Sequence, residues 1–239
     1  MKNDIKVIGG AFFAMAAALL TSVSAAPIKV DFANETVGAE PKSFVSIVGV
    51  WRIESEGGTK VLAVDGRQWK EGQSAAGIAD KARALYGERY AEFLDRVQAY
   101  AYFPYSVAKD VQDFTNGEIA VRFEGISGRI DQGAGLLFNL KPNGDYLTVR
   151  FNGKEDNLVL WTFKSGKRSF VKKGTHDVHL KMGEWHRMKI AIAGTQLRGY
   201  LDDELLLEYT LAEPVSGKVG LWSKTDSVSQ YDDYRVIDS

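Results

Sequence analysis

The stretch that decides the fold is G-E-I-A-V-R-F at Gly117–Phe123, and its pattern returns as Y-L-T-V-R-F-N at Tyr146–Asn152 and M-K-I-A-I at Met188–Ile192. In each stretch apolar residues alternate with polar or small ones, which is the period of a β-strand with one buried and one solvated face. Asn-Gly, Ser-Gly and Ala-Gly pairs separate such runs and are typical of hairpin turns. Residues 117–237 therefore predict an antiparallel sandwich or barrel.

The region before this stretch has a different organisation. Short strands are predicted at 44–48, 50–54 and 60–64, with glycine-rich turns between them. Residues 75–100 change to a period of three to four, which indicates an amphipathic helix or helix pair, broken near Gly87. We therefore expect one domain over residues 26–239, with a mainly helical insertion at 67–113.

The composition narrows the class of protein. The chain has 239 residues, 45% of them hydrophobic and 26% charged, which is ordinary for a globular protein and excludes a disordered, collagen-like or polytopic membrane chain. Thirty Lys and Arg against 31 Asp and Glu leave a net charge of −1, so no global field attracts nucleic acid. The lack of cysteine excludes disulfides, a thiolate nucleophile and a Cys-ligated zinc.

Residues 1–25 have the pattern of a secretory signal peptide. Lys2 and Lys6 precede the apolar run Val7–Leu20, and Val23-Ser24-Ala25 offers small residues for cleavage after Ala25. The run is shorter than the about 20 apolar residues that a transmembrane helix needs, although an uncleaved anchor stays an alternative. We expect a secreted or periplasmic protein without a membrane span after cleavage.

The C-terminal motifs carry a family resemblance. G-E-W-H at Gly183–His186, G-K-V-G-L-W-S at Gly217–Ser223 and Y-D-D-Y at Tyr231–Tyr234 occur in that order, and V-G-V-W at Val48–Trp51 is similar to an opening strand pair. This order resembles the concanavalin A-like lectin/glucanase superfamily, and within it laminin G-like and 3-keto-disaccharide hydrolase-type domains. The resemblance implies an all-β, two-sheet antiparallel jelly-roll sandwich, here with a helical insertion.

The resemblance also implies two properties of the site. One is a structural calcium ion, for which Asp31, Asp232 and Asp233 could supply oxygen ligands; the alternative is that these carboxylates lie on turns or in ion pairs, and no cofactor other than calcium is expected. The other is chemistry on a glycan, with the carboxylate pair that glycosidases use. The E-x-D-x-E strand of family-sixteen glycoside hydrolases does not occur, and Glu54 and Glu56 lead into a predicted solvated turn. The sequence thus names no catalytic residue, and the acids worth testing are Asp131, Glu155, Asp156 and Asp226.

Other catalytic patterns are also missing. The sequence contains no G-x-S-x-G motif, so it gives no sign of a nucleophile elbow. His176 and His179 are three residues apart, which places them on opposite faces of a strand and argues against a zinc site; His186 is the third histidine. Asp202-Asp203 is interpreted as a hairpin turn rather than a catalytic pair.

The candidate ligand-binding residues are polar or aromatic side chains on strands or at strand ends. Such groups recognise sugars because rings stack on pyranose faces and planar polar groups bind hydroxyls. We expect Arg122, Asn139 and Arg150 to share one sheet face if their strands are neighbours. The full set comprises Arg122, Asp131, Gln132, Asn139, Tyr146, Arg150, Asn152, Trp161, Trp222, Lys224 and Asp226.

Three hypotheses follow for the function. The leading one is recognition of an oligo- or polysaccharide on one sheet face. The second is hydrolysis of a glycoside or keto-glycoside. The third is a structural or protein-interaction module whose surface includes Tyr100, Tyr102, Phe103 and Tyr105. A basic segment at 164–168 and 172–173 is either a solvated face or a contact for an acidic polysaccharide or anionic envelope surface.

Overall fold

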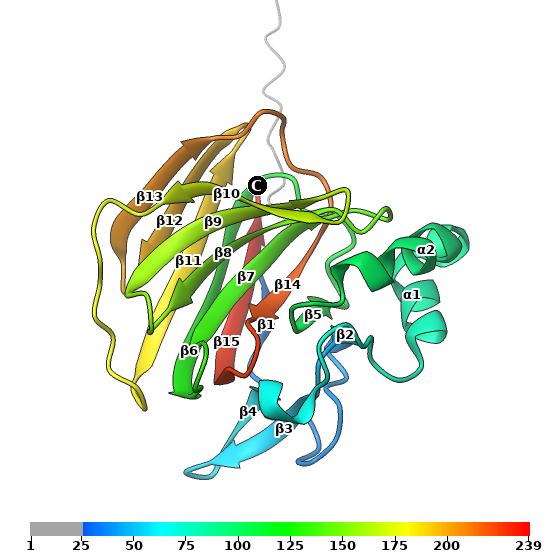
Figure 1. Cartoon of the computed structure of the whole chain (residues 1–239), viewed down its shortest axis with the longest axis horizontal. Helices are drawn as coiled ribbons and strands as arrows, with labels where there is room; N and C mark the ends of the chain where they lie inside the picture. The colour runs from blue at the N-terminus through cyan, green and yellow to red at the C-terminus, as the bar shows by residue number, and fades with distance from the viewer. Residues whose placement is uncertain (1–25) are drawn as a thin grey trace, which may run out of the picture.

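A computed structural model describes residues 26–239, so the predicted signal peptide at 1–25 lies outside the described residues. The described chain forms two antiparallel sheets that face each other, as the jelly-roll prediction required (Figure 1). None of the described helices is long and apolar enough to cross a membrane. Sheet A runs in the spatial order β13 (Glu204–Thr210), β12 (Gln196–Leu201), β11 (Trp185–Ala193), β6 (Gly117–Ser127), β15 (Val228–Asp238), β4 (Thr59–Asp65), β3 (Trp51–Glu56), with β1 (Ile28–Val30) beside β15.

Sheet B is the second layer of the sandwich. Its spatial order is β10 (Lys167–Lys173), β9 (Asn157–Lys164), β8 (Tyr146–Asn152), β7 (Gly133–Leu140), β14 (Lys218–Ser223), β5 (Tyr105–Ala108), β2 (Phe44–Val48). The predicted alternation holds on β6, where Ile119, Val121 and Phe123 point into the main core between the sheets. Burial of these inward rows is the main source of stability of the sandwich.

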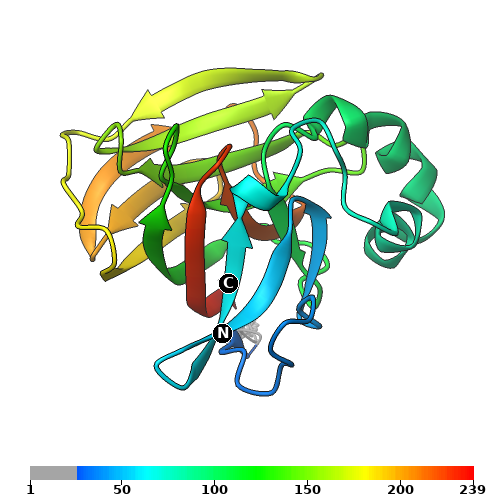
Figure 2. The same ribbon diagram turned by 60° about the horizontal axis from the view of Figure 1, so that its bottom comes forward.

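The insertion between β4 and β5 is helical, as its sequence period predicted. It contains η1 (Gly66–Gln68), α1 (Ile78–Tyr86), η2 (Gly87–Arg89) and α2 (Tyr90–Tyr100). The break falls at Gly87, whose φ of 54° is one that residues with a side chain rarely adopt. Both views place the helices at one side of the sandwich, beside β2 and β5 (Figure 1, Figure 2).

A second core joins the helices to the outer face of sheet B. Phe93 and Val97 from α2 are buried in it together with Leu137, Tyr105 and Trp222 from the sheet. The insertion therefore covers β2, β5 and β14 and reaches Tyr146 on β8 and Phe163 on β9, and it leaves an open half of this face formed by the rest of β8 and β9 and by β10.

One sequence-based grouping is wrong. Arg122 lies on β6 in sheet A, whereas Asn139 on β7 and Arg150 on β8 belong to sheet B. The chain crosses from one sheet to the other between β6 and β7, and alternation along a strand cannot show such a crossing. The three side chains therefore do not share a sheet face.

The turn prediction at Asp202-Asp203 is confirmed. These residues connect β12 and β13 with φ values of 48° and 66°, the left-handed conformations that a two-residue hairpin turn requires. Asp202 also accepts a hydrogen bond from the backbone N–H of Arg187 at 2.7 Å. Its role is thus to close the hairpin and tie it to β11.

Candidate functional site

On the open half of the outer face of sheet B, the pairing of the strands places side chains of neighbouring strands side by side in rows. Phe170 on β10 pairs with Trp161 on β9, and Trp161 pairs with Thr148 on β8. Two predicted ligand residues of this face, Tyr146 and Trp222, are only 2% and 1% exposed, because the second core covers them. Contacts with a ligand on this face therefore depend on the rows nearer the edge strand β10.

An aromatic cleft lies where β9 and β10 approach the insertion. It is a hollow of about 240 Å³ lined by Glu71, Ala99, Tyr102, Phe103, Phe163, Gly166 and Arg168. The Arg168 guanidinium lies 5.0 Å from the centre of the Phe103 ring and 4.4 Å from that of Trp161. Tyr102 and Phe170, which stand at or near the cleft, are 48% and 58% exposed. The cleft thus combines accessible rings with one cation and one carboxylate.

Trp161 forms the wall between the cleft and the rest of the face. Its ring meets Phe170 edge-on at 5.7 Å between centroids. The indole Nε1 atom is buried and has no hydrogen-bond partner among the described residues. A buried donor without a partner costs free energy, and because this N–H is buried, a ligand acceptor can reach it only if a neighbouring side chain moves.

A polar network continues the face beyond Trp161, at the ends of β8 and β9. The Arg150 guanidinium lies 5.8 Å from the Trp161 ring centre and donates hydrogen bonds to Asn157 Oδ1 and Glu155 Oε2, both at 2.6 Å. The Arg150 side chain is only 2% exposed. The members of the network are Asp131, Arg150, Asn152, Glu155, Asn157 and Lys224.

Lys224 and Asn152 hold two acids of the network together. The Lys224 ammonium lies 2.7 Å from Asp131 Oδ1 and 3.2 Å from Glu155 Oε1. These two oxygens are therefore less than about 6 Å apart, by the geometry of a shared partner. The Asn152 amide donates to the same two oxygens at 2.9 and 3.0 Å. Burial opposes ionisation of Glu155, but the charge of Arg150 and its hydrogen bonds lower the pKa of Glu155 to about 2.

Asp226 and Gln132 support the network rather than face a cleft. The Asp226 carboxylate accepts hydrogen bonds of 2.9 to 3.1 Å from the backbone N–H groups of Arg129, Ile130 and Asp131. Burial alone would raise the pKa of Asp226, and these hydrogen bonds lower it. The Gln132 backbone N–H donates to Asn152 Oδ1 at 3.1 Å. Both contacts fix the loop that presents Asp131.

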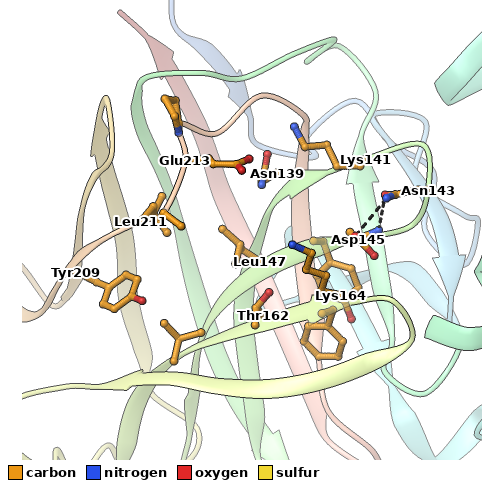
Figure 3. A pocket seen from close by; sticks show the side chains of 15 residues that line it. Asn139, Lys141, Asn143, Asp145, Leu147, Thr162, Lys164, Tyr209, Leu211 and Glu213 are labelled. Carbon is orange, nitrogen blue, oxygen red and sulfur yellow. Dashed lines mark hydrogen bonds between the residues drawn. The ribbon is translucent and has the colours of Figure 1, made fainter.

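An end pocket of about 400 Å³ opens at one end of the sandwich (Figure 3). Leu147, Val171 and Leu211 are among the apolar residues that line it, and Lys141, Lys164, Asp145 and Glu213 are its charged residues. Asn139 and Tyr146 line it as well. Asn139 accepts a hydrogen bond from the backbone N–H of Ser216 at 3.0 Å, so its oxygen is already used within the protein.

The structure thus brings most of the predicted ligand residues to sheet B, but not to one place. Asp131, Gln132, Arg150, Asn152, Lys224 and Asp226 belong to or support the polar network, Trp161 borders the cleft, and Asn139 and Tyr146 line the end pocket. Arg122 stands apart on sheet A, where its guanidinium lies 5.0 Å from the Trp185 ring centre and 3.7 Å from Asp232.

Several residues near the cleft are not predicted as ligand contacts by the sequence. Arg168 falls in the basic segment and Phe170 has no predicted role, although their spacing of two residues on β10 places both on one strand face. No local signal pairs Glu56 with Glu124, because they lie on different strands. Glu56 leads into the exposed turn Gly57-Gly58 as expected. Burial and the nearby Glu56 carboxyl nevertheless raise the pKa of Glu124 to about 7.

The calcium site implied by the resemblance does not fit the residues present. The Asp233 carboxylate is already shared by Arg187 at 3.5 Å and Arg235 at 2.8 Å. Within residues 26–239, no three His, Cys, Asp or Glu side chains converge as a metal site would require. The three histidines each face one carboxylate: His176 that of Glu204, His179 that of Asp156 and His186 that of Asp202.

Comparison with solved structures identifies the architecture. The carbohydrate-binding module CBM66 from Bacillus subtilis matches with a TM-score of 0.56 at 12% identity, over 82% of this chain and 96% of that one. A prokaryotic β-1,3-1,4-glucanase (lichenase) from a mouse hindgut metagenome matches with 0.54 at 12% identity, over 89% and 99%. The Crh5 transglycosylase matches with 0.53 at 11% identity, over 90% and 85%.

The chain has the concanavalin A-like jelly-roll fold. Sequence comparison adds nothing to this statement: no protein-family model matches the chain, and no curated protein matches it. The similarity to these solved structures establishes the fold alone, since function resides in the sites that are built on a fold. The narrower resemblance to laminin G-like and keto-disaccharide hydrolase-type domains stays a prediction.

Proposed function

We propose that this protein binds a glycan on the open half of the outer face of sheet B and that it acts outside the cytoplasm. The observation that carries the proposal is the aromatic cleft, where Arg168 stacks on Phe103 and Trp161 beside the exposed rings of Tyr102 and Phe170. Aromatic faces bind the apolar faces of sugar rings, and planar polar groups bind hydroxyls.

Two further points support this proposal. Neighbours of the same fold are named a carbohydrate-binding module and a β-1,3-1,4-glucanase, so the fold is one on which glycan sites are built. The predicted signal peptide at 1–25 would bring the protein to where polysaccharides occur. The polar network next to Trp161 would supply hydrogen-bonding groups at the far end of the face.

Hydrolysis is the second candidate, and one observation favours it. Asp131 and Glu155 present oxygens less than about 6 Å apart, close to the 5–5.5 Å separation of carboxyls in retaining glycosidases. Such an enzyme also needs one carboxyl that is protonated at the working pH. Glu155 has a pKa of about 2, and Lys224 contacts both acids, so this pair supports binding better than hydrolysis.

The third candidate, a protein-interaction surface at the end of the insertion, has less support. Tyr105 is fully buried, Phe103 packs against Trp222 at 5.3 Å, and the side chain of Tyr100 lies outside the described residues. Tyr102 is left as an exposed ring. It stands in a cleft with Arg168 and Glu71 rather than on a broad apolar patch, which partner surfaces usually present.

The test is binding of the protein to a panel of neutral and acidic polysaccharides by affinity electrophoresis, followed by titration calorimetry on the hits. We expect Phe170→Ala and Trp161→Ala each to weaken binding about tenfold or more, since stacked rings contribute substantially to recognition. Phe170 is 58% exposed, so its loss should leave folding intact.

Leu205→Ala is the matched control, because Leu205 is an apolar side chain 40% exposed on sheet A. It should bind as the unaltered protein does. A panel with no bound polysaccharide, or a bound one that is insensitive to both aromatic substitutions, would overturn the proposal.

A further inference from the structure

A further cavity lies where the helical insertion meets the sandwich. It measures about 580 Å³, with α1 and η2 on one side and the loop before β6, the turn after β7 and the start of β14 on the other. It shares Lys141 with the end pocket and no residue with the aromatic cleft. We call it the junction cavity, and its polar lining includes Arg83, Arg89, Gln112, Asp113, Lys141 and Lys218.

Lys218 brings a buried cation to the wall of the junction cavity. It is the first residue of β14, and because side chains alternate along a strand, it shares the outer face of sheet B with Trp222. Its Nζ atom lies 5.5 Å from the centre of the Tyr86 ring and donates hydrogen bonds to the carbonyl O of Gln112 at 3.2 Å and to Gln112 Oε1 at 3.3 Å. Tyr86 and Gln112 line the cavity as well, so the ammonium stands at its wall, although Lys218 is only 5% exposed.

The protein supplies this cation with no counter-ion. Both hydrogen bonds of Lys218 Nζ go to uncharged oxygens, and no carboxylate among the described residues forms an ion pair with it. Asp113 acts on it only from a longer distance, and the Asp113 carboxylate instead accepts a hydrogen bond of 2.9 Å from the Ser216 hydroxyl. Burial lowers the pKa of the Lys218 ammonium, and the charge of Asp113 only partly opposes this. A buried charge without a partner costs free energy, which an anion from solution would recover.

The other charged groups leave the junction cavity positive. The Lys141 ammonium donates to the carbonyl O of Ser216, which carries no charge. The two arginines of the lining are each paired with a carboxylate of the insertion, at 3.2 and 2.8 Å. Two ammonium groups therefore stand against one carboxylate, that of Asp113.

A lysine that only tied the loop before β6 to β14 would be held by short hydrogen bonds. An ammonium that meets a carboxylate makes bonds of about 2.7–2.9 Å, whereas the two bonds of Lys218 to Gln112 are 3.2 and 3.3 Å long. An ammonium has three donor hydrogens, so one is left after these two bonds. Gln112 is also exposed, so its side chain can give way to a ligand.

We propose that the junction cavity binds a small oxyanion, one that carries a carboxylate, sulfate or phosphate group, with Lys218 as its main contact and Lys141 as a second. The anion would take the place of Gln112 Oε1 on the Lys218 ammonium. This inference goes beyond the proposed function, because it uses no residue of the aromatic cleft.

The experiment titrates the protein with sodium acetate, sodium sulfate and sodium phosphate at constant ionic strength, and it measures the melting temperature and the heat of binding. We expect at least one anion to raise the melting temperature in a saturable way, since a ligand that binds only the folded protein stabilises it. Sulfate and phosphate also stabilise proteins by being excluded from their surface, so only the part of the rise that Lys218→Met removes counts as binding. The anion with the highest affinity shows whether a carboxylate, a sulfate or a phosphate group is preferred.

Gln112→Glu is the sharper variant, because it places a carboxylate beside Lys218 at an exposed position. It should raise the melting temperature without added anion and weaken anion binding about tenfold or more, since the new carboxylate occupies the ammonium and repels the ligand. Gln196→Glu is the matched control, because it adds the same charge at an exposed glutamine of sheet A. It should bind the anion as the unaltered protein does.

Two results would overturn the inference. One is that no anion raises the melting temperature more in the unaltered protein than in Lys218→Met. The other is equal anion affinity in Gln112→Glu and Gln196→Glu, a comparison that decides alone if Lys218→Met does not fold. Phe170→Ala should keep the anion affinity of the unaltered protein, so this inference and the proposed glycan site fail independently.

Discussion

The side chain of Arg150, which is only 2% exposed, donates a hydrogen bond of 2.6 Å to Glu155. A guanidinium is always charged at neutral pH, so this cation is buried in its ionised form. Glu155, 39% exposed, connects it to the surface and to Lys224. The pair thus holds the far end of the proposed binding face in one arrangement.

Replacing Arg150 should be costly. Arg150→Met should lower the free energy of unfolding by roughly 3 kcal/mol, because Asp131 and Glu155 then lose a buried counter-ion. Arg150→Met/Glu155→Gln should recover part of this loss, and urea unfolding of the single and double variants measures the coupling. Arg122→Met, on the outer face of sheet A, should cost about 1 kcal/mol or less. Equal costs at the two arginines would contradict this account.

Asp226 should control the order of the loop before β7. Asp226→Ala leaves the backbone N–H groups of Arg129, Ile130 and Asp131 without their acceptor, and should cost roughly 1–3 kcal/mol. Amide hydrogen exchange at these residues should become faster. Asp226→Asn keeps one acceptor oxygen and should show a smaller effect. Unchanged exchange in Asp226→Ala would show that the loop is held by other contacts.

The carboxyl groups of Glu56 on β3 and Glu124 on β6 should make the stability of the protein depend on pH. Burial, with a hydrogen bond and repulsion from Glu56, raises the pKa of Glu124 from its ordinary value near 4.5 to about 7. The folded state therefore binds more protons than the unfolded state between pH 4.5 and 7, and this contribution to stability falls as the pH rises through that window. Glu124→Gln should remove the slope and stabilise the protein at pH 8, as measured by urea unfolding at several pH values.

Glu118→Gln supplies the control for this measurement. Glu118 lies on the same strand and pairs with Lys189 at the surface, at 3.3 Å. Its substitution should leave the pH dependence of unfolding parallel to that of the unaltered protein. If Glu124→Gln gives the same parallel curve, the pKa of Glu124 is not raised in the folded protein.

The second core should determine how firmly the insertion is docked. Phe93 is fully buried and its ring lies 5.0 Å from that of Tyr86. Phe93→Ala should weaken docking by roughly 3 kcal/mol or more and speed proteolytic cleavage within residues 67–113. Arg96→Ala, an exposed position of the same helix, should not change the cleavage rate. Equal rates would mean that the insertion is held in place by its ends alone.

The sequence predicted the fold through periodicity. Alternation at Ile119, Val121 and Phe123 placed these residues in the core, and the change of period after residue 75 marked the helices with their break at Gly87. Each of these is a local signal, because the side-chain period follows from the geometry of a single element. The signal does not say which sheet a strand joins, and so Arg122 was grouped with Arg150.

The site was predictable only in part, for the same reason. The sequence indicates Asp131, Asn152 and Lys224 one by one as polar residues at strand ends, and the fold brings them together from two loops and the end of β8. Trp222 had the same polar or aromatic signature, yet the insertion covers it. Whether an outward ring is accessible depends on what packs above it, and that contact is between segments more than a hundred residues apart.

The insertion also limits the footprint of any polymer on sheet B. It covers β2, β5 and β14, reaches Tyr146 on β8 and Phe163 on β9, and leaves the rest of β8, β9 and β10 uncovered. Neighbouring strands are about 4.8 Å apart. A chain laid across the strands would meet the insertion after roughly 10 Å, whereas one laid along β9 and β10 would meet α2 only at the β9–β10 turn, where Gly166 lies against Ala99. Measuring the affinity for oligosaccharides of increasing length therefore shows how the ligand is oriented on the sheet. If the affinity stops rising at a short length, the ligand lies across the strands and ends at the helices. If the affinity keeps rising with length, the ligand follows the strands.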